Sequence, residues 1–130
     1  MREIKFRAWD KQSRIWLDDD EYVIKPDSGL VSEIDYAEGY VVIAADNHDA
    51  ILEEFTGLKD KNGVEIYEGD IICQQMRFVE TNGVIFWQED KARFAVNLDG
   101  FITTITKPQE HSYEVIGNIH ENADLLDEQS

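Results

Sequence analysis

The sequence predicts a mainly β protein that ends in a small antiparallel barrel, or strongly bent sheet, and a short C-terminal helix. Apolar and polar residues alternate with a period of two near the N-terminus, and β-branched and aromatic residues gather in short runs. Turn-forming residues separate these runs at short intervals. At 130 residues, the chain has the length of one domain or of two small lobes that share a core.

Clean alternation identifies residues 3–9 as the first predicted strand. One face would carry Ile4, Phe6 and Ala8, and the other Lys5, Arg7 and Trp9. A polar turn at 10–14 leads into a second strand at 15–17, so that the two strands make a hairpin.

The next segment contains shorter elements. Residues 22–24 are predicted to form a strand that Pro26 ends, because proline cannot donate a hydrogen bond to a sheet. Residues 30–38 show mixed periodicity and end in a glycine-containing turn, and 40–45 are predicted to form a buried strand. Residues 50–55 fit either a short helix or a strand, because so few residues do not let periodicity decide.

The middle of the chain is predicted to contain two tight turns. Asp60, Asn62 and Gly63 fit the first, third and fourth positions of a type I turn that ends in a left-handed glycine. A second turn, centred on Gly69, redirects the chain into a strand that begins at Ile71. We therefore assign a structural turn role to Gly57, Asp60, Asn62, Gly63, Glu68, Gly69 and Asp70.

The C-terminal half is predicted to form a small antiparallel barrel from five strands. Asn82-Gly83 is the preferred pair for a two-residue type I′ turn, and Asp99-Gly100 forms a further turn. Gly117 suits a bend or bulge in the last strand. Asn122 is a candidate cap for a helix at 123–127. The five strands are predicted at 71–81, 84–87, 92–98, 101–106 and 113–119.

Charge and composition exclude several classes of function. The net charge of −16 repels phosphates and anionic lipids, and therefore disfavours general binding to nucleic acids or membrane surfaces. Acids are densest in residues 17–55, which hold twelve of them and a single base, Lys25. The single cysteine, Cys73, excludes an internal disulfide, and no apolar run is long enough for a membrane helix. These features predict a cytoplasmic protein that favours basic partners.

Four segments together resemble the YopX family, small proteins of bacteriophages and prophages. They are MREIKFRAWD (1–10), FTGLKDKNG (55–63), IYEGDII (66–72) and VIGNIHEN (115–122). Their order and spacing match from end to end, and the central stretch is the most specific. The resemblance implies an N-terminal β-rich lobe, residues 1–57, followed by a small SH3-like barrel, residues 58–130, or one continuous domain. It also favours a strand at 50–55, and it supplies no catalytic residues.

No catalytic or metal-binding pattern stands out. The three histidines, His48, His111 and His120, lie far apart in the sequence and lack partners at ligand spacing. Glu65, Glu68 and Asp70 could pair as acid and base, but they flank a turn glycine, where polar residues are expected. We therefore predict no catalytic residue, no metal, no cofactor and no enzymatic activity.

Contact with other molecules is the remaining prediction. The leading hypothesis is a non-enzymatic phage or prophage accessory protein that contacts an unidentified phage or host protein in the bacterial cytoplasm. The alternatives are an acidic mimic of DNA that inhibits a host nucleic-acid-binding protein, and nucleic-acid binding through the SH3-like barrel. A homo-oligomer is left open. Exposed strands at a barrel edge, or the acidic region 17–55, would form the contact surface. The residues predicted to belong to it are Trp9, Asp18, Asp19, Asp20 and Glu21.

Overall fold

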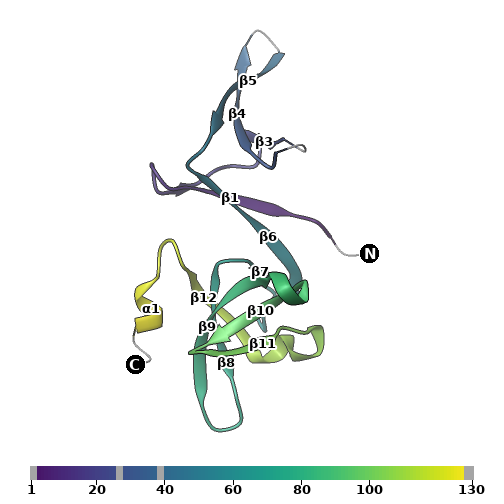
Figure 1. The fold of residues 1–130 in the computed structure, drawn as a ribbon, viewed down its shortest axis with the longest axis vertical. Helices are drawn as coiled ribbons and strands as arrows, with labels where there is room; N and C mark the ends of the chain where they lie inside the picture. Colours follow the sequence, from purple (N-terminus) through teal and green to yellow (C-terminus); the bar gives the residue numbers. More distant parts are fainter. Residues whose placement is uncertain (1–2, 26–27, 38–39, 128–130) are drawn as a thin grey trace. The chain divides into compact units, whose positions relative to one another are not determined.

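The computed structural model describes residues 3–25, 28–37 and 40–127, and most of its ordered elements are antiparallel strands (Figure 1). It confirms the mainly β fold class. The predicted breaks at Pro26 and at 38–39 lie outside the described residues. Within the described part of the chain, no helix is long and apolar enough to cross a membrane.

Two compact units make up the chain. The smaller unit comprises residues 6–53, and the larger unit comprises residues 1–5 and 54–130. Strand β6 (Ala50–Lys59) contributes residues to both, which confirms strand rather than helix at 50–55. The predicted division between residues 57 and 58 also falls within this strand.

The smaller unit contains a hairpin and a three-stranded sheet in the order β3-β4-β5. Strand β4 is absent from the sequence prediction. A register shift between Glu33 and Ile34 interrupts its pairing with β5. Buried Ala8, Tyr22 and Val31 form the core of the unit. Its strands are β1 (Phe6–Asp10), β2 (Ile15–Trp16), β3 (Tyr22–Ile24), β4 (Val31–Ala37) and β5 (Tyr40–Asn47).

The larger unit is built on a curled five-stranded antiparallel sheet in the order β11-β10-β9-β8-β12. Strand β7 (Glu65–Tyr67) pairs antiparallel with β6, Phe55 lying opposite Tyr67 and Lys59 opposite Glu65. Short helical turns at Glu89–Lys91 and Lys107–Ser112 connect strands, and helix α1 (Asp124–Asp127) confirms the predicted C-terminal helix. The five strands are β8 (Asp70–Gln75), β9 (Glu80–Gln88), β10 (Arg93–Leu98), β11 (Phe101–Thr104) and β12 (Tyr113–Asn118).

Alternate residues of these strands form the core of the larger unit. Phe94, Val96 and Leu98 point inward from β10, as their alternation predicts. They pack in one cluster with Ile85 of β9 and Ile72 of β8. Each fully buried aliphatic side chain of this kind contributes about 1.5–3 kcal/mol to folding. The cluster is completed by Ile66, Ile105 and Tyr113.

The turn predicted at Asn82-Gly83 is wrong. The chain reverses at 76–79 instead, where the Met76 N–H donates to the Val79 carbonyl at 2.8 Å, and Gly83 lies within β9 opposite Ile72. A Cβ atom at Gly83 would lie 2.6 Å from the Asn97 carbonyl oxygen. Glycine is therefore needed for the close approach of β10, and not for a turn.

Two other glycine predictions are confirmed. Asp99 and Gly100 have φ values of 52° and 90°, which suit a two-residue type I′ hairpin turn between β10 and β11. The register of β12 against β8 shifts between Val115 and Gly117, so the last strand bends where its glycine stands.

Asp60 organises the central turn with its buried carboxylate. Its Oδ1 accepts hydrogen bonds from the Asn62 and Val64 N–H groups at 2.8 and 2.9 Å, and the Gly63 N–H donates to its carbonyl at 3.0 Å. Its Oδ2 accepts the N–H of Val115 in β12 at 2.9 Å. One side chain thus closes the turn and joins it to a strand 55 positions later.

The second turn uses its acids in a similar way. Buried Asp70 accepts the Tyr67 N–H through Oδ2 at 2.8 Å, and Glu68 accepts the Glu54 N–H through Oε1 at 2.8 Å. Between them, the Gly69 N–H donates to the carbonyl of Ile85 at 2.8 Å. Backbone donors therefore occupy these carboxylates, and Gly57, Gly63 and Gly69 all have positive φ.

Replacing Gly63 tests the left-handed backbone conformation, because its φ is 82° and a Cβ atom added there would meet nothing within 4 Å. A Gly63→Val variant should lose about 1–2 kcal/mol of unfolding free energy from backbone strain alone. Gly63→Asn should lose less, because asparagine tolerates this conformation. Urea denaturation measures both, and equal stability of Gly63→Val and the parent would contradict the assignment.

Replacing Asp60 tests the link between the turn and β12. Asp60→Asn keeps one acceptor oxygen but leaves at least one partly buried N–H without its acceptor, which should cost about 1–3 kcal/mol. The matched control is Asp90→Asn, an exposed position where the change should stay within about 0.5 kcal/mol. If urea denaturation gives the two variants the same stability, the Asp60 carboxylate does not carry this link.

Candidate functional site

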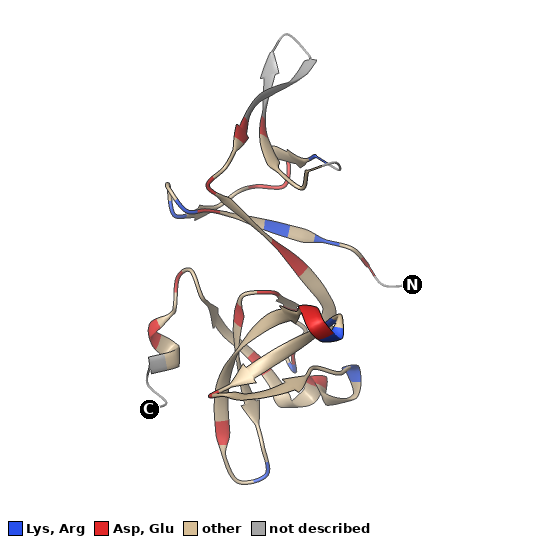
Figure 2. Ribbon diagram, in the orientation of Figure 1, with Lys and Arg blue, Asp and Glu red and all other residues tan. Residues whose placement is uncertain are grey.

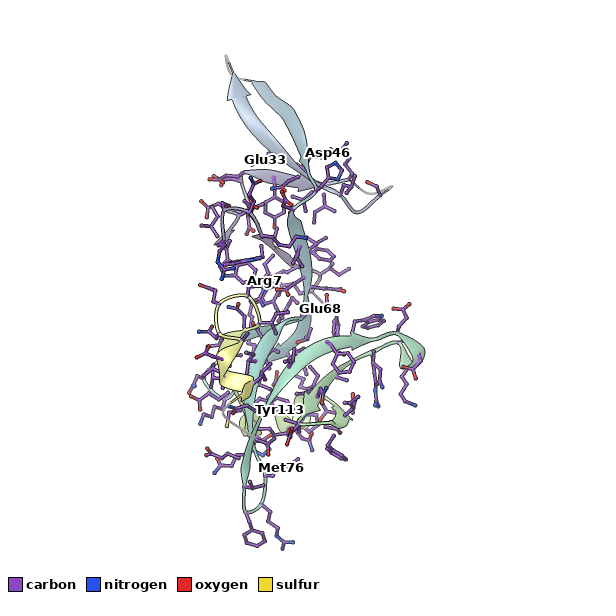
Figure 3. All side chains as sticks on the ribbon, turned by 60° about the vertical axis from the view of Figure 1, so that its left-hand side comes forward. Arg7, Glu33, Asp46, Glu68, Met76 and Tyr113 are labelled. Carbon is purple, nitrogen blue, oxygen red and sulfur yellow. The ribbon has the colours of Figure 1, made fainter. Side chains whose placement is uncertain are left out.

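The end of the β8–β9 hairpin presents the most exposed aromatic side chain of the described residues. This hairpin tip, Met76–Val79, extends past the sheet, because β9 pairs with β10 only at 84–88 while the β8–β9 ladder continues to Gln75 and Glu80. Phe78 is 93% exposed and Val79 is 58% exposed. Figure 3 shows side chains beyond Met76 that project away from the strands.

The hairpin tip combines apolar surface with a positive charge. The Arg77 guanidinium lies 5.7 Å from the centroid of the Phe78 ring, within cation–π range. An aromatic ring on a hairpin can fill an apolar pocket of another protein, and such buried anchors carry much of the binding energy at interfaces. The chemistry available here is therefore recognition.

A second apolar surface lies along β11, at the edge of the five-stranded sheet. Phe101 is 61% exposed and Ile102 is 43% exposed. The strand carries no Lys, Arg, Asp or Glu, as its uniform tan colour in Figure 2 shows. We call the side of β11 that faces away from β10 its outer edge.

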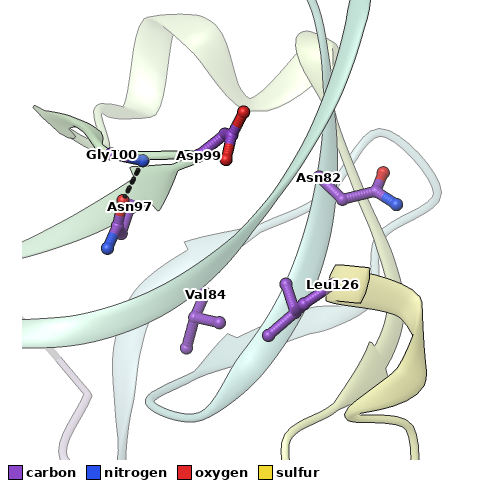
Figure 4. A pocket seen from close by; sticks show the side chains of 6 residues that line it. All are labelled: Asn82, Val84, Asn97, Asp99, Gly100 and Leu126. Carbon is purple, nitrogen blue, oxygen red and sulfur yellow. Dashed lines mark hydrogen bonds between the residues drawn. The ribbon is translucent and has the colours of Figure 1, made fainter. Parts of the chain in front are cut away.

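A pocket of about 250 Å³ opens beside the turn between β10 and β11 (Figure 4). Asn97 Oδ1 accepts the Gly100 N–H at 2.8 Å, and Asn82 Nδ2 donates to the Leu125 carbonyl at 3.4 Å. Asp99 adds an exposed carboxylate. The pocket can therefore accept hydrogen-bond donors and a positive charge. The residues that line it are Asn82, Val84, Asn97, Asp99, Gly100 and Leu126.

The predicted acidic contact surface is exposed. Asp18, Asp20 and Glu21 place carboxylate oxygens within 4.8 Å of one another, and Asp19 is exposed beside them. Repulsion from Asp18 raises the pKa of Glu21 above its ordinary value. Exposed carboxylates this close together attract cations weakly, and their role as a contact surface stays a prediction.

The prediction that Trp9 belongs to this contact surface is wrong, because its side chain is only 4% exposed. Its ring packs edge-to-face on Trp16, with centroids 5.0 Å apart. Arg7 lies 4.3 Å from the Trp16 ring centroid and binds Glu53, with 3.1 Å between Nε and Oε1. Adjacent Ala8 and Trp9 are both buried, so β1 is covered on both faces and Trp9 is a core residue.

Cys73 and the acids near the central turns show no catalytic arrangement. Burial, together with nearby Glu80 and Glu114, raises the pKa of the Cys73 thiol, which makes it a poor nucleophile at neutral pH. The carboxylates of Glu68 and Asp70 accept backbone N–H groups, while Glu65 pairs with Lys5 at 2.6 Å.

The sequence prediction missed the hairpin tip, and it expected contact at an exposed strand of a barrel edge without identifying β11 as that strand. It placed Arg77, Phe78 and Val79 inside a strand, because Asn82-Gly83 was the stronger turn signal. The available signal at β11 was its lack of charge, which a buried strand shares. Exposure of Phe101 depends on which strands pair, and the local sequence does not contain that information.

Comparison with known proteins identifies a family. The model of the family described as YopX protein matches residues 5–127. The structure of EF1440 from Enterococcus faecalis is similar, with 28% identity, a TM-score of 0.62, and 97% of this chain and 99% of that chain covered. The structure of yopX from Bacillus subtilis shares 22% identity over the same fractions, with a TM-score of 0.65. No protein with a curated description matches. This chain belongs to the YopX family.

Proposed function

We propose that this protein is a non-enzymatic accessory protein of a bacteriophage or prophage that acts in the bacterial cytoplasm by contact with another protein. The observation that carries the proposal is the hairpin tip, where Phe78 is 93% exposed beside exposed Val79. Exposed apolar side chains that adjoin one another in a folded protein commonly mark interaction sites.

Charge supports a protein partner over a nucleic acid. The net charge of −16 opposes a phosphate backbone, and Arg77 is the only base of the hairpin tip. A partner with an apolar pocket and a surrounding basic surface would suit both the Phe78 ring and the long-range field of the protein. The partner is either a phage protein or a host protein.

Site-specific photo-crosslinking tests the proposal. A photoreactive phenylalanine analogue at position 78 should yield a discrete protein adduct in bacterial cells that host the phage. The matched control carries the analogue at Val64, which is 47% exposed in the same unit. The same adducts at both positions, or none at position 78, would contradict the proposal.

Substitution then measures the contribution of the ring. Phe78→Ser should weaken binding of the captured partner by roughly 30-fold or more, because an aromatic anchor contributes about 2 kcal/mol or more. Its unfolding free energy should change by less than about 0.5 kcal/mol, because the side chain makes little contact with the fold. Val64→Ser should leave binding unchanged in the same titration.

A further inference from the structure

We propose that the outer edge of β11 accepts an extended, basic segment of a partner protein as an added strand, and that a Lys or Arg side chain of this segment binds Asp99 at the adjacent pocket. Addition of a strand uses backbone hydrogen bonds for affinity and side-chain pockets for selectivity. Both components are present at this edge.

The register of the β10–β11 hairpin directs backbone groups outward. Leu98 and Phe101 close the two-residue turn as a hydrogen-bonded pair, and the pairs along an antiparallel ladder alternate from there. Ile102 and Thr104 therefore direct their N–H and C=O groups away from β10. Among the described residues, neither backbone group of Ile102 or Thr104 has a partner along the outer edge.

The opposite edge of the same sheet is closed. The Lys61 N–H donates to the Tyr113 carbonyl at 3.0 Å, and Asp60 Oδ2 accepts the Val115 N–H at 2.9 Å. Further along β12, Asn122 Oδ1 accepts the Asn118 N–H at 3.2 Å. The larger unit thus covers one edge of its sheet with the central turn and leaves the edge at β11 open.

Features that usually block an edge strand are missing from β11. Folded proteins protect such edges with charged side chains, proline or bulges. Residues 101–104 contain neither charge nor proline, and their pairing with β10 runs without a register shift. The side chains of Phe101 and Ile102 lie exposed on the two faces of the strand. An added strand would cover apolar surface on both faces.

Charge identifies the occupant as basic. Ile102 pairs with Asn97, so their side chains share the face that bears the pocket. Asp99 lies in the turn that precedes β11, at the end of the strand where Phe101 and Ile102 stand. Its side chain is exposed and forms no ion pair among the described residues. An added strand would lie about 4.8 Å from β11, a spacing that a Lys or Arg side chain can cross. Lys107 follows the far end of β11, so the basic residue belongs at the Asp99 end.

A second copy of this chain is a poorer occupant. It would bring a further net charge of −16 and a second Asp99 to the same edge. The inference shares with the proposed function the premise of a protein partner, but it uses a different surface. Phe78 variants therefore do not test it, and its failure leaves the hairpin-tip proposal intact.

Nuclear magnetic resonance with defined peptides tests the proposal on the full chain. The probe is the peptide acetyl-Lys-Val-Thr-Val-Lys-Val-amide. One control peptide has Glu in place of both lysines, and the other has Pro in place of the valine that follows Thr. The basic probe should produce saturable shifts at the Ile102 and Thr104 amides and slow their hydrogen exchange. Saturable shifts confined to other residues, equal shifts with the Glu peptide, or no shifts would overturn the proposal.

Two charge variants test whether Asp99 at the pocket binds the basic side chain of the peptide. Asp99→Asn keeps a residue that tolerates positive φ and should weaken the basic probe by about twofold to fivefold, the effect of one exposed ion pair. Asp90→Asn is the matched charge control and should leave binding unchanged. Equal effects of the two variants would exclude Asp99 as the binding group. Sedimentation of the chain without peptide tests the other occupant. A dimer that the Ile102→Lys substitution dissociates would show that a second copy of the chain, and not a basic segment, binds this edge.

Discussion

The buried carboxylate of Asp60 is the interaction on which the larger unit depends. It accepts two N–H groups of its own turn and one from β12, so the local reversal of the chain and the closure of the sheet share one side chain. A carboxylate removed from water is costly unless donors replace its hydration. Three backbone donors do so here, and the adjacent Lys61 N–H binds the carbonyl of Tyr113. The core cluster forms against a sheet whose last strand is held in this way.

Local chemistry made much of this unit predictable. The turn at 60–63, the Asp99-Gly100 reversal and the bend at Gly117 each depend on conformations that a few neighbouring residues favour. Gly83 is the opposite case. A glycine is required at this position because the Asn97 carbonyl of another strand approaches it closely. The local sequence does not distinguish a glycine required for such a close approach from a glycine required for a turn. Alternation likewise predicts a polar face for Trp9. It does not reveal the burial of Trp9, since burial on both faces of β1 arises only in the folded protein.

The candidate surfaces were less predictable than the fold, because exposure is a property of the assembled sheet. Phe101 and Ile102 resemble residues of a buried strand in composition, and only the position of β11 at the edge exposes them. Phe78 is exposed because the β8–β9 ladder extends beyond the segment of β9 that pairs with β10. In both places the sequence contains the apolar residues, while strand order and strand length decide that they face solvent.

The acidic composition of the chain affects what can bind at the open edge of β11. An uncharged edge strand with exposed apolar side chains invites pairing between identical chains, and β11 has no charge of its own to prevent it. The net charge of −16 opposes the approach of a second copy over a longer range than any one side chain, although salt screens it beyond about 8 Å. The same field attracts a basic segment. One property of the composition therefore discourages self-pairing at β11 and favours the kind of partner that this edge can bind.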